Sequence, residues 1–265
     1  AWERFQELEA AGGMPAVLLD ATLAAAIGEV PSRRLAAVAT RSEPVTGVSE
    51  FPDIAESASP RAALDLQALR DRATASAPSP EVDQGTGSPT TCDPLPKVRW
   101  AEEYEALRDA SDAHLAATGS RPRVFLVNLG PVATHTARAT FAKNFFESGG
   151  IEAVTSERGR TIGYDDPADA VADVAEARVQ LACLCSSDEV YAERAVEFAT
   201  ALRDAGLAHL YLAGRPGDRR DAELAAGVTE YVHVGVDVLD VLRRAHASLG
   251  TPATNDRAST RESDR

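Results

Sequence analysis

The stretch Arg123–Gly150, RVFLVNLGPVATHTARATFAKNFFESGG, constrains the fold of this chain more than any other segment. An apolar run over Val124–Leu129 is followed by Gly130-Pro131, a short Thr-rich loop and a helical pattern that ends at Gly149-Gly150. This order predicts a strand, a turn at its carboxyl end and a helix, with His135 in the turn. Ligands of open α/β sheets bind outside the carboxyl ends of the strands, so the imidazole is predicted to lie where a cofactor would bind.

The chain after Arg123 repeats this order of strand and helix. The predicted strands are Val124–Leu129, Ile151–Thr155, Val179–Cys185, His209–Ala213 and Tyr231–Val234. The predicted helices are Thr134–Ser148, Pro167–Ala177, Asp188–Ala205, Asp218–Ala226 and Val236–Leu249. Such units with short turns predict a parallel sheet with helices on both faces. We therefore expect a flavodoxin-like doubly wound α/β domain over residues 121–250, with five strands and its switch point beside the first strand.

The part of the chain before this domain has a different pattern. Residues 1–40 have helical spacing, with a stop at Gly12-Gly13 and an interruption at Val30-Pro31. Residues 41–60 contain three prolines and a glycine, and they are expected to be mostly irregular. These segments belong to a first predicted region, residues 1–73.

Two further segments are expected to lack a packed structure. Residues 74–96 are rich in Pro, Gly, Ser and Thr and contain almost no bulky apolar side chain, which predicts a flexible linker. A linker helix is predicted over residues 97–120, where a helical pattern returns. The polar tail, residues 251–265, is predicted to be disordered.

The composition excludes several classes of partner. The chain carries 27 Lys and Arg against 41 Asp and Glu, a net charge of −14. A nucleic-acid-binding protein needs a basic face, whereas the basic pairs Arg219-Arg220 and Arg243-Arg244 are short. No long apolar span and no signal peptide are present, so we expect no membrane partner and a cytoplasmic location.

The three cysteines are too few and too oddly numbered for a disulfide framework. Cys183 and Cys185 alternate within an apolar run, which places both on the same side of one strand. Two buried, reduced thiols are favoured over a metal or redox pair.

Several common ligand sites lack their sequence signature. No GxGxxG follows the first strand and no GxxxxGK[ST] occurs, so dinucleotide and P-loop sites have no phosphate cradle. A phosphoacceptor domain would place acidic residues at the end of the first strand, where this chain has Asn128-Leu129-Gly130. Thr134 and Thr136 could contact an anion at the helix start, but an N-cap explains Thr134 better.

His135 is the one candidate ligand at this edge of the sheet. Neutral imidazole is a common metal donor, and a metal-bound His normally passes its other N–H to a carboxylate or carbonyl. Ala133 stands two residues before it, where a carboxylate would be expected. An exposed loop histidine without a function is the alternative. His114, His209, His233 and His246 have no shared spacing and are predicted to be structural, and no carboxylate pair suggests acid–base catalysis.

Three segments resemble methylmalonyl-CoA mutases. Arg121–Gly149 and the units after it resemble the cobalamin-binding domain of that family, and AWERFQELEAAGGM at Ala1–Met14 resembles the end of its catalytic barrel. ATRSEPVTGVSEFPDI at Ala39–Ile54 is long and chemically unusual, which makes chance similarity improbable. The resemblance implies a radical rearrangement between methylmalonyl-CoA and succinyl-CoA, with adenosylcobalamin supplying the chemistry.

The cofactor motifs of the family are incomplete in this chain. The family loop Asp-x-His-x-x-Gly, in which His ligates cobalt, aligns with Ala133, His135 and Arg138, so only the histidine matches. The Ser-x-Leu motif falls on Cys185-Ser186-Ser187, and the Gly-Gly pair falls on Ala213-Gly214. A bulky Arg138 is difficult to reconcile with a backbone that must lie against a corrin.

These departures make the chain similar to the small subunit of heterodimeric mutases, specifically to its C-terminal portion. The resemblance implies a partner, the large catalytic subunit. Adenosylcobalamin is expected in the holoenzyme but not on this chain, and no catalytic residue is assigned because most of the barrel lies outside the given sequence. Two alternatives stay open: a cobalamin-binding module that uses His135 as a cobalt ligand, and a stand-alone flavodoxin-like protein that binds another ligand or other proteins.

Overall fold

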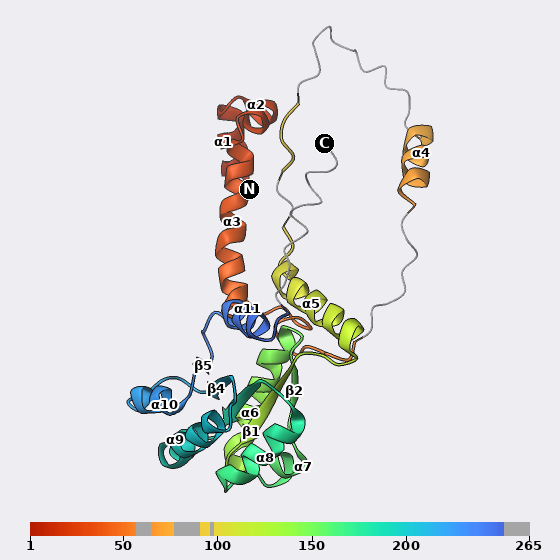
Figure 1. The fold of residues 1–265 in the computed structure, drawn as a ribbon. Coiled ribbons are helices and arrows are strands. Elements are labelled where there is room, and N and C mark those ends of the chain that lie inside the picture. Colours follow the sequence, from red (N-terminus) through yellow and green to blue (C-terminus); the bar gives the residue numbers. More distant parts are fainter. Residues whose placement is uncertain (57–64, 77–90, 96–97, 252–265) are drawn as a thin grey trace. The chain divides into compact units, whose positions relative to one another are not determined.

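The computed structural model describes residues 1–56, 65–76, 91–95 and 98–251. Its contacts divide the chain into two compact units, residues 1–30 with 55–97 and residues 31–54 with 98–265. Figure 1 labels the elements of each unit. The domain boundaries expected from the sequence stay a prediction, but the contacts group residues 31–54 with the sheet rather than with the first helices.

The first unit is helical in its described parts. It contains α1 (Trp2–Ala10), α2 (Gly13–Leu19), the start of α3 (Thr22–Ala39) and α4 (Leu66–Ser76). Gly12, with φ of 102°, separates α1 from α2 as its position predicted. Among the described residues no single helix is long and apolar enough to cross a membrane; α2 and α3 meet that test only together, as a pair bent by 71°.

Two predictions about this region are wrong in detail. The helix expected to break at Val30-Pro31 continues through Pro31 to Ala39. A proline removes one helical hydrogen bond, and the packing of Val38 and Ala39 in the core of the second unit supports the turns that follow. Residues 74–76 of the predicted linker belong to α4. Residues 91–95 have no regular structure, while 77–90, 96–97 and the predicted tail 252–265 lie outside the described residues.

The second unit contains the predicted five-stranded parallel sheet. Its strands are β1 (Arg123–Asn128), β2 (Glu152–Val154), β3 (Leu181–Cys185), β4 (His209–Ala213) and β5 (Glu230–Val232). They pair in the order β2-β1-β3-β4-β5, and every pair is parallel. This order confirms the flavodoxin-like arrangement, with the switch point between β1 and β3.

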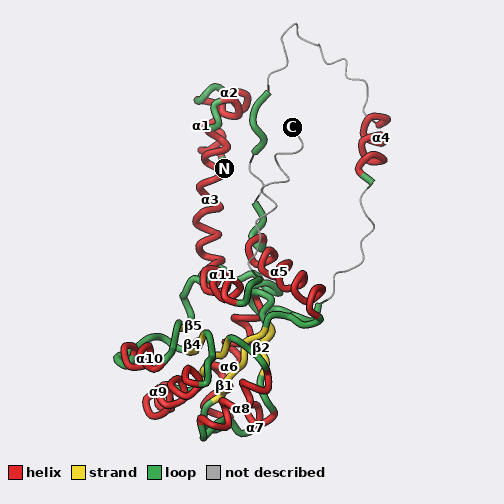
Figure 2. Tube along the Cα trace, in the orientation of Figure 1, coloured by secondary structure: helices red, strands yellow, loops and turns green. Residues whose placement is uncertain are grey.

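Helices cover both faces of this sheet, as Figure 2 shows. They are α5 (Glu102–Thr118), α6 (Val132–Ser148), α7 (Glu157–Thr161), α8 (Pro167–Ala177), α9 (Asp188–Asp204), α10 (Arg220–Ala226) and α11 (Val238–Ser248). The sequence pattern missed α7, which has little more than one turn. It also started α6 two residues late, because the helix begins directly after Pro131.

Alternation along the strands assigns the side chains to two cores. Val124, Leu126 and Cys183 pack with residues of α5, α6 and α11 on one face. Phe125 and Val127 pack with residues of α8 and α9 on the other. Cys183 and Cys185 share a face and are buried and free, as the alternation predicted. Burial raises the pKa of the Cys183 thiol well above its ordinary value, so the thiol is kept protonated.

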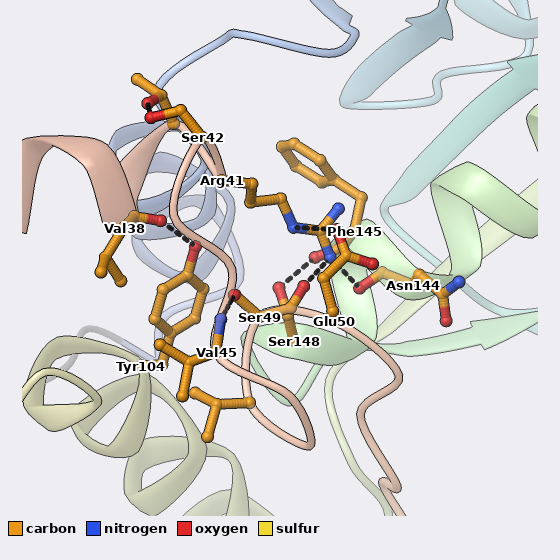
Figure 3. Close-up of polar contacts among 12 residues, drawn as sticks. Val38, Arg41, Ser42, Val45, Ser49, Glu50, Tyr104, Asn144, Phe145 and Ser148 are labelled. Atoms are coloured by element: carbon orange, nitrogen blue, oxygen red, sulfur yellow. Dashed lines mark hydrogen bonds and ion pairs between the residues drawn. The ribbon is translucent and has the colours of Figure 1, made fainter.

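Residues 40–54 contain no helix or strand, which agrees with the irregular structure expected there. They nevertheless pack closely against α6 (Figure 3). Arg41 donates hydrogen bonds to the carbonyl of Ser49 in its own segment and, at 3.2 Å, to the carbonyl of Asn144 in α6. Its side chain is 9% exposed, lies over the ring of Phe145 and has Glu50 at 3.8 Å. Burial lowers the pKa of Arg41, against the attraction of Glu50.

Helix α5 holds the same segment from the other side. The Tyr104 hydroxyl donates to the carbonyl of Val38 at 3.4 Å, and Arg108 donates to the carbonyls of Val48 and Ser148 at 3.1 Å. Arg41 and Arg108 thus place two cations at carbonyl groups in the last two turns of α6, where the helix dipole favours positive charge. The segment 40–54 is therefore an integral part of the sheet domain.

We predict that Arg41→Leu destabilises the second unit by about 1–3 kcal/mol, because two partly buried carbonyl groups lose a donor. Urea denaturation followed by circular dichroism measures the change. Arg34→Leu is the matched control, since Arg34 lies in the same unit but is half exposed, pairs with Glu43 and covers Trp100. An equal loss of stability in both variants would show that Arg41 has no special role.

A pH dependence follows from His246 in α11, which is fully buried. Its Nε2 lies 2.8 Å from the carbonyl of Gly149, and its Nδ1 lies 3.0 Å from both the carbonyl and the hydroxyl of Thr251. Burial lowers the pKa of His246, against the hydrogen bonds to Gly149 and Thr251, and the charge of His114 lowers it further.

Because this pKa is lower in the folded state, the unfolded chain takes up the proton first as pH falls below about 6.5. The contribution of neutral His246 to the free energy of unfolding is thus fully present above that pH. It decreases as the pH falls, until the pH is below the pKa of His246 in the folded state. We expect a fall in Tm between pH 7 and pH 5, and a smaller fall in His246→Gln. His233→Gln should behave like the wild type; a His246→Gln profile as steep as the wild type would contradict the assignment.

Candidate functional site at the carboxyl ends of the strands

The turn between β1 and α6 is held by backbone contacts. Gly130 has φ of 70°, a left-handed conformation that glycine adopts without strain. Its N–H donates to the carbonyl of Tyr164 at 3.1 Å, and Leu129 N–H donates to the carbonyl of Cys185 at 3.0 Å. The turn is thereby tied to the end of β3 on one side and to the segment before α8 on the other.

His135 lies in the first turns of α6, not in a loop. Its side chain is buried, with 2% of the residue exposed, so both the loop position and the exposed-histidine alternative are wrong. Nδ1 lies 3.1 Å from the carbonyl of Gly130. A carbonyl can only accept, so Nδ1 carries the proton. The helix starts early because Pro131 presets the backbone at the N-cap.

Thr134 does not cap this helix, contrary to the prediction. The N-cap residue is Pro131, and the Thr134 hydroxyl donates to the carbonyl of Pro131 at 2.7 Å. The Thr136 hydroxyl donates to the carbonyl of Val132 at 2.5 Å. Both hydroxyl hydrogens thus point to backbone carbonyls of the same turn.

The crevice at the switch point is closed by side chains of the chain itself. The Ser186 hydroxyl donates to the carbonyl of Leu129 at 2.8 Å, which joins the ends of β1 and β3. Above this contact, Arg138 of α6 forms an ion pair with Asp188 of α9 at 2.8 Å. The two helices on opposite faces of the sheet are therefore bridged across the place where open α/β sheets bind ligands.

Arg138 also reaches the end of β4. Its Nη1 donates to the carbonyl of Ala213 at 2.7 Å, and its guanidinium lies over the Tyr191 ring at 5.4 Å. A Cβ at residue 214 would lie 2.3 Å from this Nη1, so Gly214 leaves the room that the guanidinium occupies. Burial is the largest single influence and opposes the charge, but the hydrogen bond to Asp188 and the electrostatic effects of Tyr191 and Asp188 together raise the pKa of Arg138.

Tyr191 connects the ends of β3 and β4 from within the core. Its hydroxyl accepts from the N–H of Ser186 at 2.8 Å and lies 2.9 Å from the carbonyl of Leu184 and 3.0 Å from that of Ala213. Burial is the first cause that raises the pKa of Tyr191 well above its ordinary value, so this phenol stays protonated and donates.

A cavity of about 730 Å³ remains beside this network, toward β5. Its walls include Arg138, Tyr191, Gly214, Arg215 and His233, together with the apolar side chains of Phe141 and Val232. The volume is in the range of small-molecule sites. No group of three or more His, Cys, Asp or Glu that could hold a metal occurs within the described ranges.

The sequence patterns gave His135 and Arg138 but missed Tyr191 and Asp188. Both follow a strand by only a few residues, at the edge where parallel strands end, and that position was the available signal. Neither residue type is part of a recognised motif at that spacing, so the pattern alone did not single them out.

Relatives with a similar sequence over most of the chain are known. The chain is 41% identical to the methylmalonyl-CoA mutase small subunit of Streptomyces virginiae, and 36% identical to a protein of Mycobacterium tuberculosis named as a probable methylmalonyl-CoA mutase small subunit. Identity to the small subunit of Porphyromonas gingivalis is 31%. Each match covers 94% of this chain. The chain is homologous to methylmalonyl-CoA mutase small subunits.

The homology concerns part of those proteins. The chain spans 34–36% of the length of these relatives. No protein-family model matches it. The mutase resemblance first drawn from ATRSEPVTGVSEFPDI at Ala39–Ile54 is therefore confirmed over nearly the whole chain, while the activity of the complete small subunit is a separate question.

The geometry can be compared with what a corrin site of the mutase family would need. Ala133 offers no carboxylate to orient His135, whose Nδ1 faces the Gly130 carbonyl inside a helix. Arg138 replaces the glycine of the motif, and its guanidinium fills the space beside Gly214. The residues present do not fit a cobalt-bound corrin, since the ligand ring is buried and the crevice is bridged.

We predict that Tyr191→Phe destabilises the second unit by about 1–3 kcal/mol, because the buried N–H of Ser186 loses its acceptor and the carbonyls of Leu184 and Ala213 lose the one phenol hydrogen that lies near both. Thermal and urea unfolding measure this loss. Asp188→Asn is the control: its carboxylate is 68% exposed, so its ion pair contributes little. A neutral Tyr191→Phe would show that the hydroxyl network does not hold the strand ends together.

Proposed function

We propose that this chain is part of the small, non-catalytic subunit of an adenosylcobalamin-dependent methylmalonyl-CoA mutase, which interconverts methylmalonyl-CoA and succinyl-CoA. Its partner is the large catalytic subunit, and its place of action is the cytoplasm. The names of relatives at 30–41% identity support the family. The observation that carries the non-catalytic role is the bridge of Arg138 to Asp188 and to the Ala213 carbonyl.

In this proposal the cofactor is held by the partner. The flavodoxin-like domain keeps the architecture of a ligand-binding sheet but uses the ligand space for its own contacts. Ser186, Tyr191 and Arg138 link β1, β3 and β4 at their carboxyl ends through hydrogen bonds of 2.7 to 3.0 Å. Such a closed edge makes the domain a rigid body, which suits a subunit whose task is to stabilise another chain.

Two other functions are compatible with fewer of the observations. A cobalamin-binding module would need the buried His135 ring to become exposed and Arg138 to leave the crevice, and the second step breaks the hydrogen bond to the Ala213 carbonyl. A stand-alone flavodoxin-like protein would need no large subunit. The relatives are all named as small subunits, and this name favours an assembly with a second chain.

A cobalamin titration tests the cofactor part of the proposal. We expect the purified chain to leave the visible spectrum of adenosylcobalamin unchanged, since the His135 ring is buried and Arg138 bridges the crevice. Tight uptake with the spectral change of histidine ligation, abolished by His135→Ala but kept in His233→Ala, would establish the cobalamin-module alternative instead.

Co-expression tests the partner. The tagged chain is produced together with a methylmalonyl-CoA mutase large subunit, and the eluate is examined for both chains and for cobalamin. Co-elution with the cofactor only when the large subunit is present supports the proposal. Absence of the large subunit from the eluate would favour a stand-alone protein.

A further inference from the structure

A second cavity, of about 460 Å³, lies between α6, β1 and the edge strand β2, apart from the crevice that Arg138 bridges. Its walls are formed by Leu126, Asn128, His135, Thr136, Ala139, Thr140, Lys143, Ala153, Val154, Thr155 and Arg160. Its volume lies within the range of small-molecule sites. The cavity takes no part in the hydrogen-bond network of Arg138 and Tyr191.

Asn128 gives this cavity a buried acceptor without a partner. The residue is 4% exposed, and its Nδ2 donates to the carbonyl of Gly159 at 2.9 Å. Its Oδ1 is buried and has no hydrogen-bond partner among the described residues. Since buried polar atoms are nearly always paired, this oxygen is an acceptor for a hydrogen-bond donor that the described residues do not supply.

The other polar atoms at this end of the cavity are also acceptors. Because Nδ1 of His135 donates to the Gly130 carbonyl, Nε2 of the neutral ring can only accept. The Thr155 hydroxyl donates to the carbonyl of Leu126 at 3.1 Å, and the Thr136 hydroxyl donates to Val132, so lone pairs remain on both oxygens. A matching ligand must therefore supply several O–H or N–H donors.

The charges of the cavity have one sign. Lys143 and Arg160 are the charged residues of its wall, and no Asp or Glu belongs to the lining. The Lys143 ammonium pairs with Glu147. The Arg160 side chain is 66% exposed, and it lies 3.7 Å from the carboxylate of Glu157, which is 78% exposed. The pair of Arg160 with Glu157 is long and exposed and therefore weak, so the guanidinium is available to an anionic group on the ligand.

We propose that this cavity binds a small polyhydroxylated anion of the sugar phosphate class. Its hydroxyl groups donate to Asn128 Oδ1 and to the neighbouring acceptors, and its phosphate contacts Arg160 and Lys143. The apolar side chains of Leu126, Ala139 and Val154 complete the walls. The site is independent of the corrin crevice, so it stands whether or not the chain belongs to a mutase.

Isothermal titration with D-ribose 5-phosphate tests the site on the full chain. We expect saturable binding that weakens about tenfold in Arg160→Gln, which removes the guanidinium from an exposed position and leaves the fold intact. Asn128→Leu should weaken binding to a similar degree, and circular dichroism checks that this variant is folded. Arg158→Gln is the matched control, because Arg158 lies on the same short helix, pairs with Asp169 and is not part of the lining.

Two simpler probes separate the halves of the ligand. D-Ribose lacks the anion and inorganic phosphate lacks the row of hydroxyl groups, so each should bind at least about tenfold more weakly than ribose 5-phosphate. No binding of ribose 5-phosphate would overturn the proposal. Equal binding of inorganic phosphate, or equal weakening by Arg158→Gln and Arg160→Gln, would overturn it as well.

Discussion

Burial of both faces of a parallel sheet is the constraint on which this domain depends. Each strand carries apolar side chains on two sides, and water must be excluded from both. Helices α8 and α9 cover one face, and α5, α6 and α11 cover the other. The second layer is completed by residues 40–54, whose Arg41 donates to the carbonyl of Asn144 in α6. A segment far away in the sequence is thus required to finish the cover.

At the carboxyl ends of the strands, an architecture that binds ligands in other proteins holds the domain together through its own side chains. In an open α/β sheet the strands end at a crevice between helices of opposite faces. Here Arg138 spans that crevice from α6 to Asp188 of α9, and Tyr191 joins the ends of β3 and β4 below it. Carbonyl groups at this edge receive hydrogen bonds from side chains of the chain itself. The proposed non-catalytic role rests on this arrangement.

Much of the fold could be predicted because its signals are local. Short apolar runs located the strands, and the turn residues between them and the helical patterns separated the units; both led to the parallel five-stranded sheet. The errors have equally physical causes. Pro31 did not end α3, because packing of Val38 and Ala39 supports the helix beyond it. Helix α7 was not predicted, because a helix of five residues is too short to show a hydrophobic periodicity.

The candidate site was predictable only in its location. His135 was correctly placed beside the end of β1, but its burial and its contact with Gly130 depend on how α6 begins. The partners of Arg138 lie 50 and 75 residues away along the chain, so no local pattern could name them. The same holds for Asn128: that its Oδ1 has no hydrogen-bond donor among the described residues is seen only when its neighbours in space are known.

The sequence by itself determined the order of strands and helices, the faces on which the strand side chains lie, and the relationship to mutase small subunits. These properties follow from hydrophobic periodicity and from residue identity, which are read along the chain. Only the tertiary structure decided that Arg138 closes the switch-point crevice, that Arg41 fastens residues 40–54 to α6, and that Asn128 faces a separate cavity. Each of these depends on atoms brought together by folding from distant positions, and their hydrogen bonds have no signature in the linear sequence.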